Sequence, residues 1–158
     1  MYIAVEPECP WEVFVKIYTG SDHAGLALKQ RLIQHLKQLG HDVADLGTES
    51  GESCDYPDFA HAVAKKVAAE KGTLGLLTCG SGIGMSIAAN RHPGARAALC
   101  HNALEAGLSR QHNDANILVL GGRIVGEELA IHILDAFLGA SFAGGRHARR
   151  VEKIELPA

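Results

Sequence analysis

The sequence predicts an α/β protein with a three-layer αβα, Rossmann-like fold built on a five-stranded parallel sheet. Short runs of β-branched or apolar residues alternate with longer segments in which apolar residues recur every three or four positions. One short run, LGLLT at 74–78, is almost wholly apolar, as is typical of a parallel strand covered on both faces. Five strand–helix units in series favour a parallel sheet between two layers of helices.

The first half of the chain supplies two of these units. A strand is expected at 13–19, VFVKIYT, because β-branched and aromatic residues are frequent there. The apolar face of the helix that follows comprises Leu28, Leu32, Leu36 and Leu39. Gly40 ends that helix, and a weaker strand, DVADL, is expected at 42–46. Pro57 begins the second helix, where its missing N–H is not needed, and Gly72 ends it.

The second half of the chain completes the alternation. In order, its expected elements are a strand at 74–78, a helix ending near Asn90, a strand at 95–100, a helix at about 102–110, a strand at 116–121 and a helix at 127–138. The last helix presents Ala130, Leu134 and Phe137 on its inner face.

Composition narrows the functional classes. The 158 residues are assigned to a single domain, residues 1–158, in which residues 1–12 form an N-terminal extension. A net charge of −3 without a long basic block argues against nucleic acid as a partner. No apolar stretch approaches the ~20 residues of a membrane helix, and the N-terminus does not resemble a secretory signal. The four cysteines lack C-x-x-C spacing, which argues against a zinc ribbon and fits a reducing cytoplasm.

Ligands of parallel sheets bind beyond the carboxyl ends of the strands, so TGSDH, TCGSGIG, CHN and LGGR are the segments expected to carry the site. Asp22 and His23 follow the first strand at the turn into a helix. An isolated Asp here would serve equally well as a helix N-cap or as a ligand contact, and the adjacent His23 favours ligand contact. The pair is suited to holding sugar hydroxyls or moving a proton.

The segment 78–86, TCGSGIGMS, is the most informative motif. It has G-x-G-x-G spacing, no acidic residue follows the next strand, and no G-K-[ST] is present, so neither a dinucleotide fingerprint nor a P-loop fits. A run of backbone amides leading into a helix suits an anion or a developing oxyanion. Cys79 lies beside these amides, a setting that favours a thiolate, although a single cysteine is more often a small core residue.

Two polar segments follow later in the chain. His112 and Asn113 lie in SRQHND, which either caps the preceding helix or, at the ligand-binding edge, serves proton transfer. Arg146 and Arg150 are four residues apart, so on a helical turn they form a phosphate clamp or, alternatively, a solvated basic tail. Arg123, in LGGR, is expected near the same opening.

Taken together and in this order, SDHAG, YPDFA, CGSGIGMSIAAN, SRQHND and GGRHARRV resemble the family of type B ribose-5-phosphate and galactose-6-phosphate isomerases. The resemblance runs from about Phe14 to the C-terminal end. It implies an aldose–ketose isomerase of sugar phosphates in carbohydrate metabolism that uses no metal and no organic cofactor. It also implies a homodimer, or a dimer of dimers, with active sites at the subunit interfaces.

The resemblance further implies roles for individual residues. Cys79 matches the base that removes a proton from carbon, and His112 matches the group that opens the sugar ring. The implied substrate contacts are Asp22, His23, Tyr56, Gly80, Ser81, Gly82, Ile83, Gly84, Asn113, Arg123, Arg146 and Arg150.

The expected reaction is therefore ribose 5-phosphate to ribulose 5-phosphate, a step of the pentose phosphate pathway, through a cis-enediolate. Allose 6-phosphate, galactose 6-phosphate and four-carbon sugar phosphates remain open as substrates. A non-catalytic phosphosugar-binding module is the alternative if the thiol and His112 do not reach one ligand. A flavodoxin-like or nucleotide-binding domain is disfavoured by the missing acidic residue and by an aromatic content of 5%.

Overall fold

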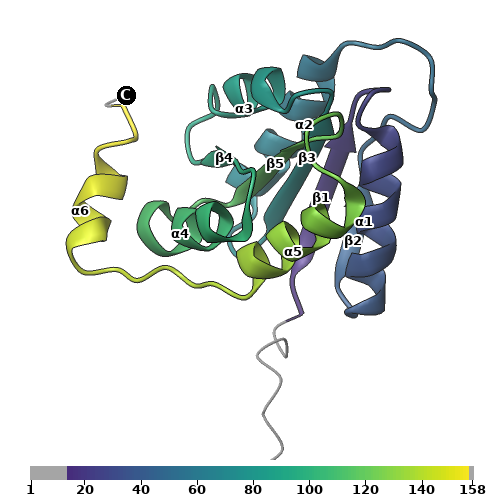
Figure 1. Cartoon of the computed structure of the whole chain (residues 1–158). Helices are drawn as coiled ribbons and strands as arrows, with labels where there is room; N and C mark the ends of the chain where they lie inside the picture. The colour runs from purple at the N-terminus through teal and green to yellow at the C-terminus, as the bar shows by residue number, and fades with distance from the viewer. Residues whose placement is uncertain (1–13, 157–158) are drawn as a thin grey trace, which may run out of the picture.

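The computed structural model describes residues 14–156 as a parallel sheet flanked by helices (Figure 1). The strands are β1 (Lys16–Ser21), β2 (Asp42–Asp45), β3 (Leu74–Cys79), β4 (Ala97–Leu99) and β5 (Ile117–Gly121). The helices are α1 (Leu26–Gln38), α2 (Tyr56–Ala69), α3 (Ile83–Ala89), α4 (Ala103–Asn113), α5 (Glu127–Leu138) and α6 (Arg146–Glu152). All strand pairs are parallel, in the order β2-β1-β3-β5-β4, which confirms the predicted fold class.

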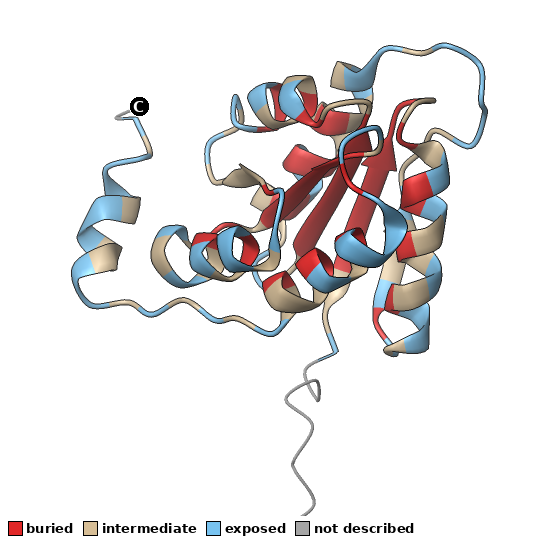
Figure 2. Ribbon diagram, viewed as in Figure 1, coloured by how far each residue is buried: buried red, intermediate tan, exposed pale blue. Residues whose placement is uncertain are grey.

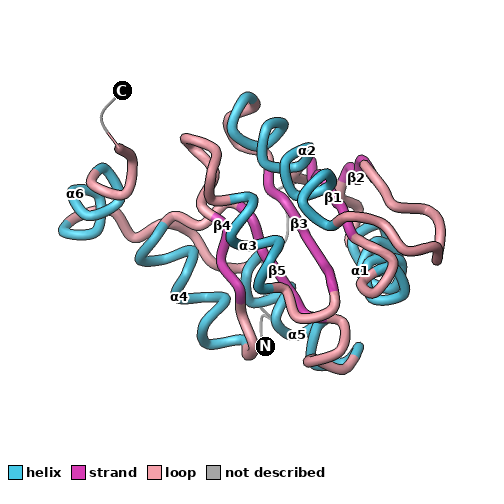
Figure 3. Tube along the Cα trace, turned by 90° about the horizontal axis from the view of Figure 1, so that it is seen from above, coloured by secondary structure: helices cyan, strands magenta, loops and turns pink. Residues whose placement is uncertain are grey.

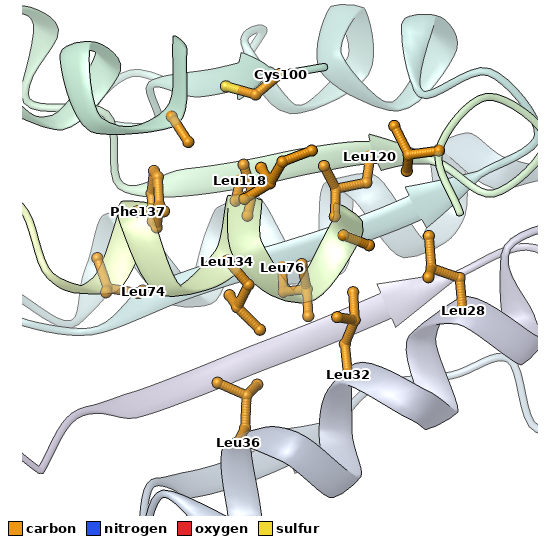
Figure 4. Packing of buried hydrophobic residues seen from close by; sticks show 14 of the residues in the cluster. Leu28, Leu32, Leu36, Leu74, Leu76, Cys100, Leu118, Leu120, Leu134 and Phe137 are labelled. Atoms are coloured by element: carbon orange, nitrogen blue, oxygen red, sulfur yellow. The ribbon is translucent and has the colours of Figure 1, made fainter. Parts of the chain in front are cut away.

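Two apolar clusters fill the spaces between the sheet and its helices. One joins α1, α4 and α5 to one face of the sheet, through side chains such as Leu32, Leu118 and Phe137 (Figure 4). The other joins α2 and α3 to the opposite face, through side chains such as Val63 and Met85. Burial is highest along the central strands (Figure 2), as the apolar run in β3 predicts. Seen from above, α6 lies at the periphery, beyond α4 (Figure 3).

Most predicted element boundaries are close to the observed ones. Helix α5 spans 127–138 as expected. The first strand begins at Lys16 instead of 13, because Lys16 pairs with Asp42, the first residue of β2. Residue 13 itself lies outside the described part of the chain. β1 also extends two residues past 19, where Gly20 and Ser21 continue the pairing with β3. β4, an edge strand with one neighbour, is only three residues long.

Two further differences concern helices. Helix α4 continues to Asn113 instead of ending near 110, and Leu39 lies one residue beyond α1, as its C-cap.

Within residues 14–156, no helix is long and apolar enough to cross a membrane. The extension predicted at 1–12 lies outside the described residues.

The strand order determines where a ligand can enter. From β1 the chain moves outward to β2 on one side, whereas from β3 the sheet continues to β5 and β4 on the other. The carboxyl ends of β1 and β3 therefore flank a topological switch point, where the helices diverge and leave a crevice. β1 ends at Ser21, directly before Asp22, and β3 ends at Cys79.

Candidate active site

A cleft of about 610 Å³ lies at this switch point. Its walls come from the turn after β1, the start of α2, the loop and first turns after β3, and the loop after β5. Predicted site residues that line it are Asp22, His23, Tyr56, Cys79, Gly80, Ser81, Ile83, Gly84 and Arg123. Gly82 lies buried in the same loop. Four segments far apart in sequence thus meet at one point.

Cys79 forms the floor of the cleft. It is the last residue of β3, and only 4% of its surface is exposed. The backbone N–H of Gly82 donates to its Sγ at 3.1 Å. The sulfur therefore lies in the core of the fold and also accepts a backbone hydrogen bond from the N-cap residue of α3.

The glycine-rich loop is fixed by backbone contacts. The N–H of Gly122 donates to the Cys79 carbonyl at 2.7 Å, and that of Arg123 donates to the Gly80 carbonyl at 3.0 Å. These bonds join the loops after β3 and β5, and bring the Arg123 side chain beside Gly80. A Cβ on Gly84 would collide with the ring of Tyr56, so the phenol packs directly on the first turn of α3 only because residue 84 lacks a side chain.

Asp22 and His23 form another part of the cleft wall. Asp22 is 7% exposed, and its Oδ1 accepts a hydrogen bond from the Gly25 N–H at 2.9 Å, which holds the turn into α1. The N-cap of α1 is Gly25, so Asp22 braces the turn without capping the helix. A Cβ on Gly25 would overlap the Thr78 carbonyl, because α1 starts in direct contact with β3.

His23 is held by a distant part of the chain. Its Nδ1 lies 3.3 Å from the backbone nitrogen of Cys54, which can only donate. Nδ1 therefore accepts, and the proton of the neutral ring is on Nε2. This tautomer gives the cleft a hydrogen-bond donor suited to a hydroxyl or phosphate oxygen.

The remaining predicted residues lie elsewhere. His112 and Asn113 are the last two residues of α4, and Asn116 precedes β5 and bonds to the backbone at Arg96, just before β4. This is the amino edge of the sheet, so the expectation that 109–114 lies at the ligand-binding edge is wrong. A helix that follows a parallel strand runs antiparallel to it, and its last turn arrives where the next strand begins.

The register of the sheet shows how far His112 lies from Cys79. Cys79 pairs with Gly121 at the far end of β5, and β5 advances about 13 Å from Ile117 to that point. A histidine side chain cannot bridge this length of strand. His112 and Cys79 of one chain therefore do not share one small ligand.

A second group of predicted residues gathers around His112. The rings of His112 and His147 are stacked, with centroids 4.3 Å apart and an angle of 8° between their planes. Arg146 and Arg150 lie on α6 with His147, and both are exposed. Partial desolvation, followed by the nearby charges of His112 and the two arginines, lowers the pKa of His147. Asn113 borders a smaller hollow of about 240 Å³ between β4 and α4.

The comparisons with known proteins assign the chain to a family. A model described as Ribose/Galactose Isomerase matches residues 17–154. The chain belongs to the ribose/galactose isomerase family. Ribose-5-phosphate isomerase B of Escherichia coli (strain K12) is 51% identical over 139 residues, which cover 88% of this chain and 93% of that protein.

Two solved structures of the family are similar in fold. A ribose 5-phosphate isomerase from Thermotoga maritima has a TM-score of 0.87 at 52% identity, covering 89% of this chain and 97% of that one. Ribose-5-phosphate isomerase B from Mycoplasma genitalium, a structure with bound ribulose 5-phosphate, has a TM-score of 0.86 at 46% identity, covering 89% and 93%.

Among residues 14–156, no three His, Cys, Asp or Glu side chains are grouped so that they could hold a metal ion. The expectation that the reaction needs no metal and no organic cofactor stays a prediction.

Two residues that support the isomerase-family cleft were missed from the sequence. Lys29 is fully buried, and its Nζ bonds to Asp45 Oδ1 and the Thr48 carbonyl, each at 2.7 Å. The backbone of Thr48 in turn bonds to Ser21, directly before Asp22. The sequence signal for Lys29 is its position on the apolar face of α1. The sequence carries no signal for the Cys54 amide that orients His23, because every residue except proline has a backbone N–H.

Proposed function

We propose that this chain is a ribose-5-phosphate isomerase, which interconverts ribose 5-phosphate and ribulose 5-phosphate without a metal or an organic cofactor. Family membership and the names of the relatives support this proposal. The observation that carries it is the Gly82 N–H donated to the buried Cys79 sulfur, inside a cleft that Asp22, His23 and Arg123 also line.

The proposed chemistry is a proton transfer between neighbouring carbons. The Cys79 thiolate removes the proton from C2 of the open-chain aldose, and the C–H electron pair moves to give a cis-enediolate. Backbone amides of residues 80–84, apart from the Gly82 N–H that bonds to the Cys79 sulfur, and the Ser81 hydroxyl stabilise the negatively charged oxygen. A proton moves between the two substrate oxygens, and the thiol then delivers its proton to C1. Sulfur thus ends the cycle as a thiolate, and the substrate has gained and lost one proton.

Ring opening and phosphate binding are assigned to the second group of residues. His112 moves a proton between the ring oxygen and the anomeric hydroxyl, with Asp22 of the cleft assisting. Arg146 and Arg150 hold the phosphate as paired guanidinium groups, and Asn113 contacts the substrate beside them. These groups lie at the opposite edge of the sheet from Cys79, so each active site combines the cleft of one copy with the α4–α6 region of another.

The exposed surface fits this two-copy arrangement. Ile83 and Ile87 on α3 are 55% and 56% exposed at the rim of the cleft. Leu104 and Leu108, four residues apart on α4, are 71% and 37% exposed. Large apolar side chains grouped around a site are typical of surfaces that a partner covers. The proposed assembly is a homodimer, or a dimer of dimers, in the cytoplasm, where the free thiols of Cys54, Cys79 and Cys100 persist.

The experiment compares turnover of ribose 5-phosphate by the wild type and by Cys79→Ala. Ribose 5-phosphate, allose 6-phosphate, galactose 6-phosphate and a tetrose phosphate are assayed in parallel, and the first is expected to have the highest kcat/KM. Cys79→Ala should lower kcat at least about a thousandfold while substrate still protects the protein against thermal unfolding. Substantial turnover by that variant contradicts the assigned base. Binding without turnover by the wild type would instead favour a phosphosugar-binding module.

A further inference from the structure

We propose that His147 is a positioning residue, which holds the imidazole of His112 in the orientation needed for proton transfer. The proposal rests on the function proposed above, because it assigns His147 a role through the ring-opening histidine. The observation that carries it is the parallel stack of the two rings, with centroids 4.3 Å apart and planes 8° from parallel.

The stack matters because, within one copy, little else restrains the His112 ring. His112 lies in the last turn of α4, next to Asn113, where intrahelical backbone bonds come to an end. Within residues 14–156, its ring takes part in none of the hydrogen bonds of the structure. One face of the ring is covered by His147. Rotation of His112 about its side-chain bonds therefore requires separation of the stack.

The backbone holds both sides of the stack in place. The N–H of Ala143 donates to the carbonyl of Gln111 at 3.0 Å, which joins the segment before α6 to the last turn of α4. The N–H of His147 donates to the carbonyl of Gly144, also at 3.0 Å, and so closes the first turn of α6. Both anchors lie within a few residues of the two rings. The contact is thus a fixed junction between two helices.

The charge of His147 suits the same role. Partial desolvation and the neighbouring positive charges lower its pKa, which favours the neutral ring. A neutral ring leaves His112 free to gain and release a proton, whereas two imidazolium rings in contact would repel each other. The π face of the neutral ring also stabilises an imidazolium that forms on His112 during the transfer.

The first test separates positioning from phosphate binding. His147→Ala removes the ring and should lower kcat about ten- to a hundredfold, the range expected when a catalytic group is misplaced by about 1 Å, with KM changed less than about twofold. His147→Phe retains a flat ring that cannot be protonated, and should recover most of kcat. Arg149→Ala, on an exposed part of α6, is the matched control and should behave as wild type. A raised KM with unchanged kcat would overturn the proposal.

The second test is a double-mutant cycle with His112→Asn. If His147 acts through His112, His147→Ala should cause no further loss of kcat once His112 is absent. Independent, multiplicative losses would contradict the proposal, because they would mean that His147 acts on the substrate or on the fold by another route.

A measurement that does not depend on turnover separates this inference from the proposed function. Proton NMR of the His112 ring should show the upfield shift of a stacked ring in wild type and in His147→Phe, and its loss in His147→Ala. If the wild type isomerises no sugar phosphate, the proposed function fails and the positioning of a catalytic group by His147 fails with it. If turnover is normal but the His112 resonances are the same in wild type and His147→Ala, only the positioning role is refuted.

Discussion

Two inactive variants of this chain should restore each other when their subunits are mixed. The prediction follows from the register of the sheet: Cys79, on β3, lies beside the last residue of β5, and His112 precedes the first, about 13 Å of strand away. Cys79→Ala removes the proposed base from the cleft, and His112→Asn removes the ring-opening group at the opposite edge. A dimer with one subunit of each kind has one site with both groups intact and one with neither.

The size of the recovery follows from symmetry. Equal amounts of the two variants, exchanged at random, give about half mixed dimers, each with one working site of two, so the activity should approach about a quarter of wild type. The assay measures turnover of ribose 5-phosphate after subunit exchange at low denaturant. Each variant treated alone should remain inactive.

A matched control uses two substitutions in the same cleft. Cys79→Ala mixed with Asp22→Asn leaves every site of the mixed dimer with one defect, so no recovery is expected. If mixed dimers form in both experiments and the first pair does not recover, or the second pair does, the division of the active site between two copies is wrong.

Three further predictions concern single residues. Arg150→Ala should raise KM at least about tenfold with kcat within about threefold, because it weakens binding of a non-reacting phosphate; steady-state kinetics with an unchanged KM would count against the clamp. Lys29→Met should lower the free energy of unfolding by about 2 kcal/mol in urea, since Asp45 and the Thr48 carbonyl lose their partner, and an unchanged midpoint would contradict this. Burial raises the pKa of Cys100 to about 11, so the fold favours the neutral thiol. The stabilisation that the neutral thiol provides is complete below about pH 9 and is lost by about pH 11. Urea titrations should therefore show the free energy of unfolding of the wild type falling by about 3 kcal/mol over this range, a decrease that Cys100→Ala should lack.

The sequence predicted the fold and one half of the candidate site for the same physical reason. Apolar runs such as LGLLT identify buried parallel strands, and residues directly after such strands must lie at the carboxyl edge. Asp22, Cys79 and Arg123 lie at or just after the ends of three different strands, and the structure brings all three into one cleft. Local sequence is sufficient here because the position depends only on the direction of the chain.

The other half of the site depends on information that local sequence does not carry. The polar segment around His112 is compatible with either a helix cap or the ligand-binding edge, yet the end of a helix that leads into a parallel strand belongs at the amino edge. The orientation of His23 depends on a backbone amide 31 residues away, and the stack of His112 on His147 depends on how α6 packs. Contacts of this kind are fixed by tertiary structure.

The two glycines packed against the cleft have a consequence for sequence variation. Neither Gly25 nor Gly84 contributes a chemical group, but a methyl group on Gly25 would meet the rigid carbonyl of Thr78, and one on Gly84 would meet the movable ring of Tyr56. A saturation library should therefore tolerate no replacement at 25, whereas alanine at 84 should persist with altered substrate affinity. Adaptation of this cleft to another sugar would then begin at positions 56 and 84, and position 25 would stay constant.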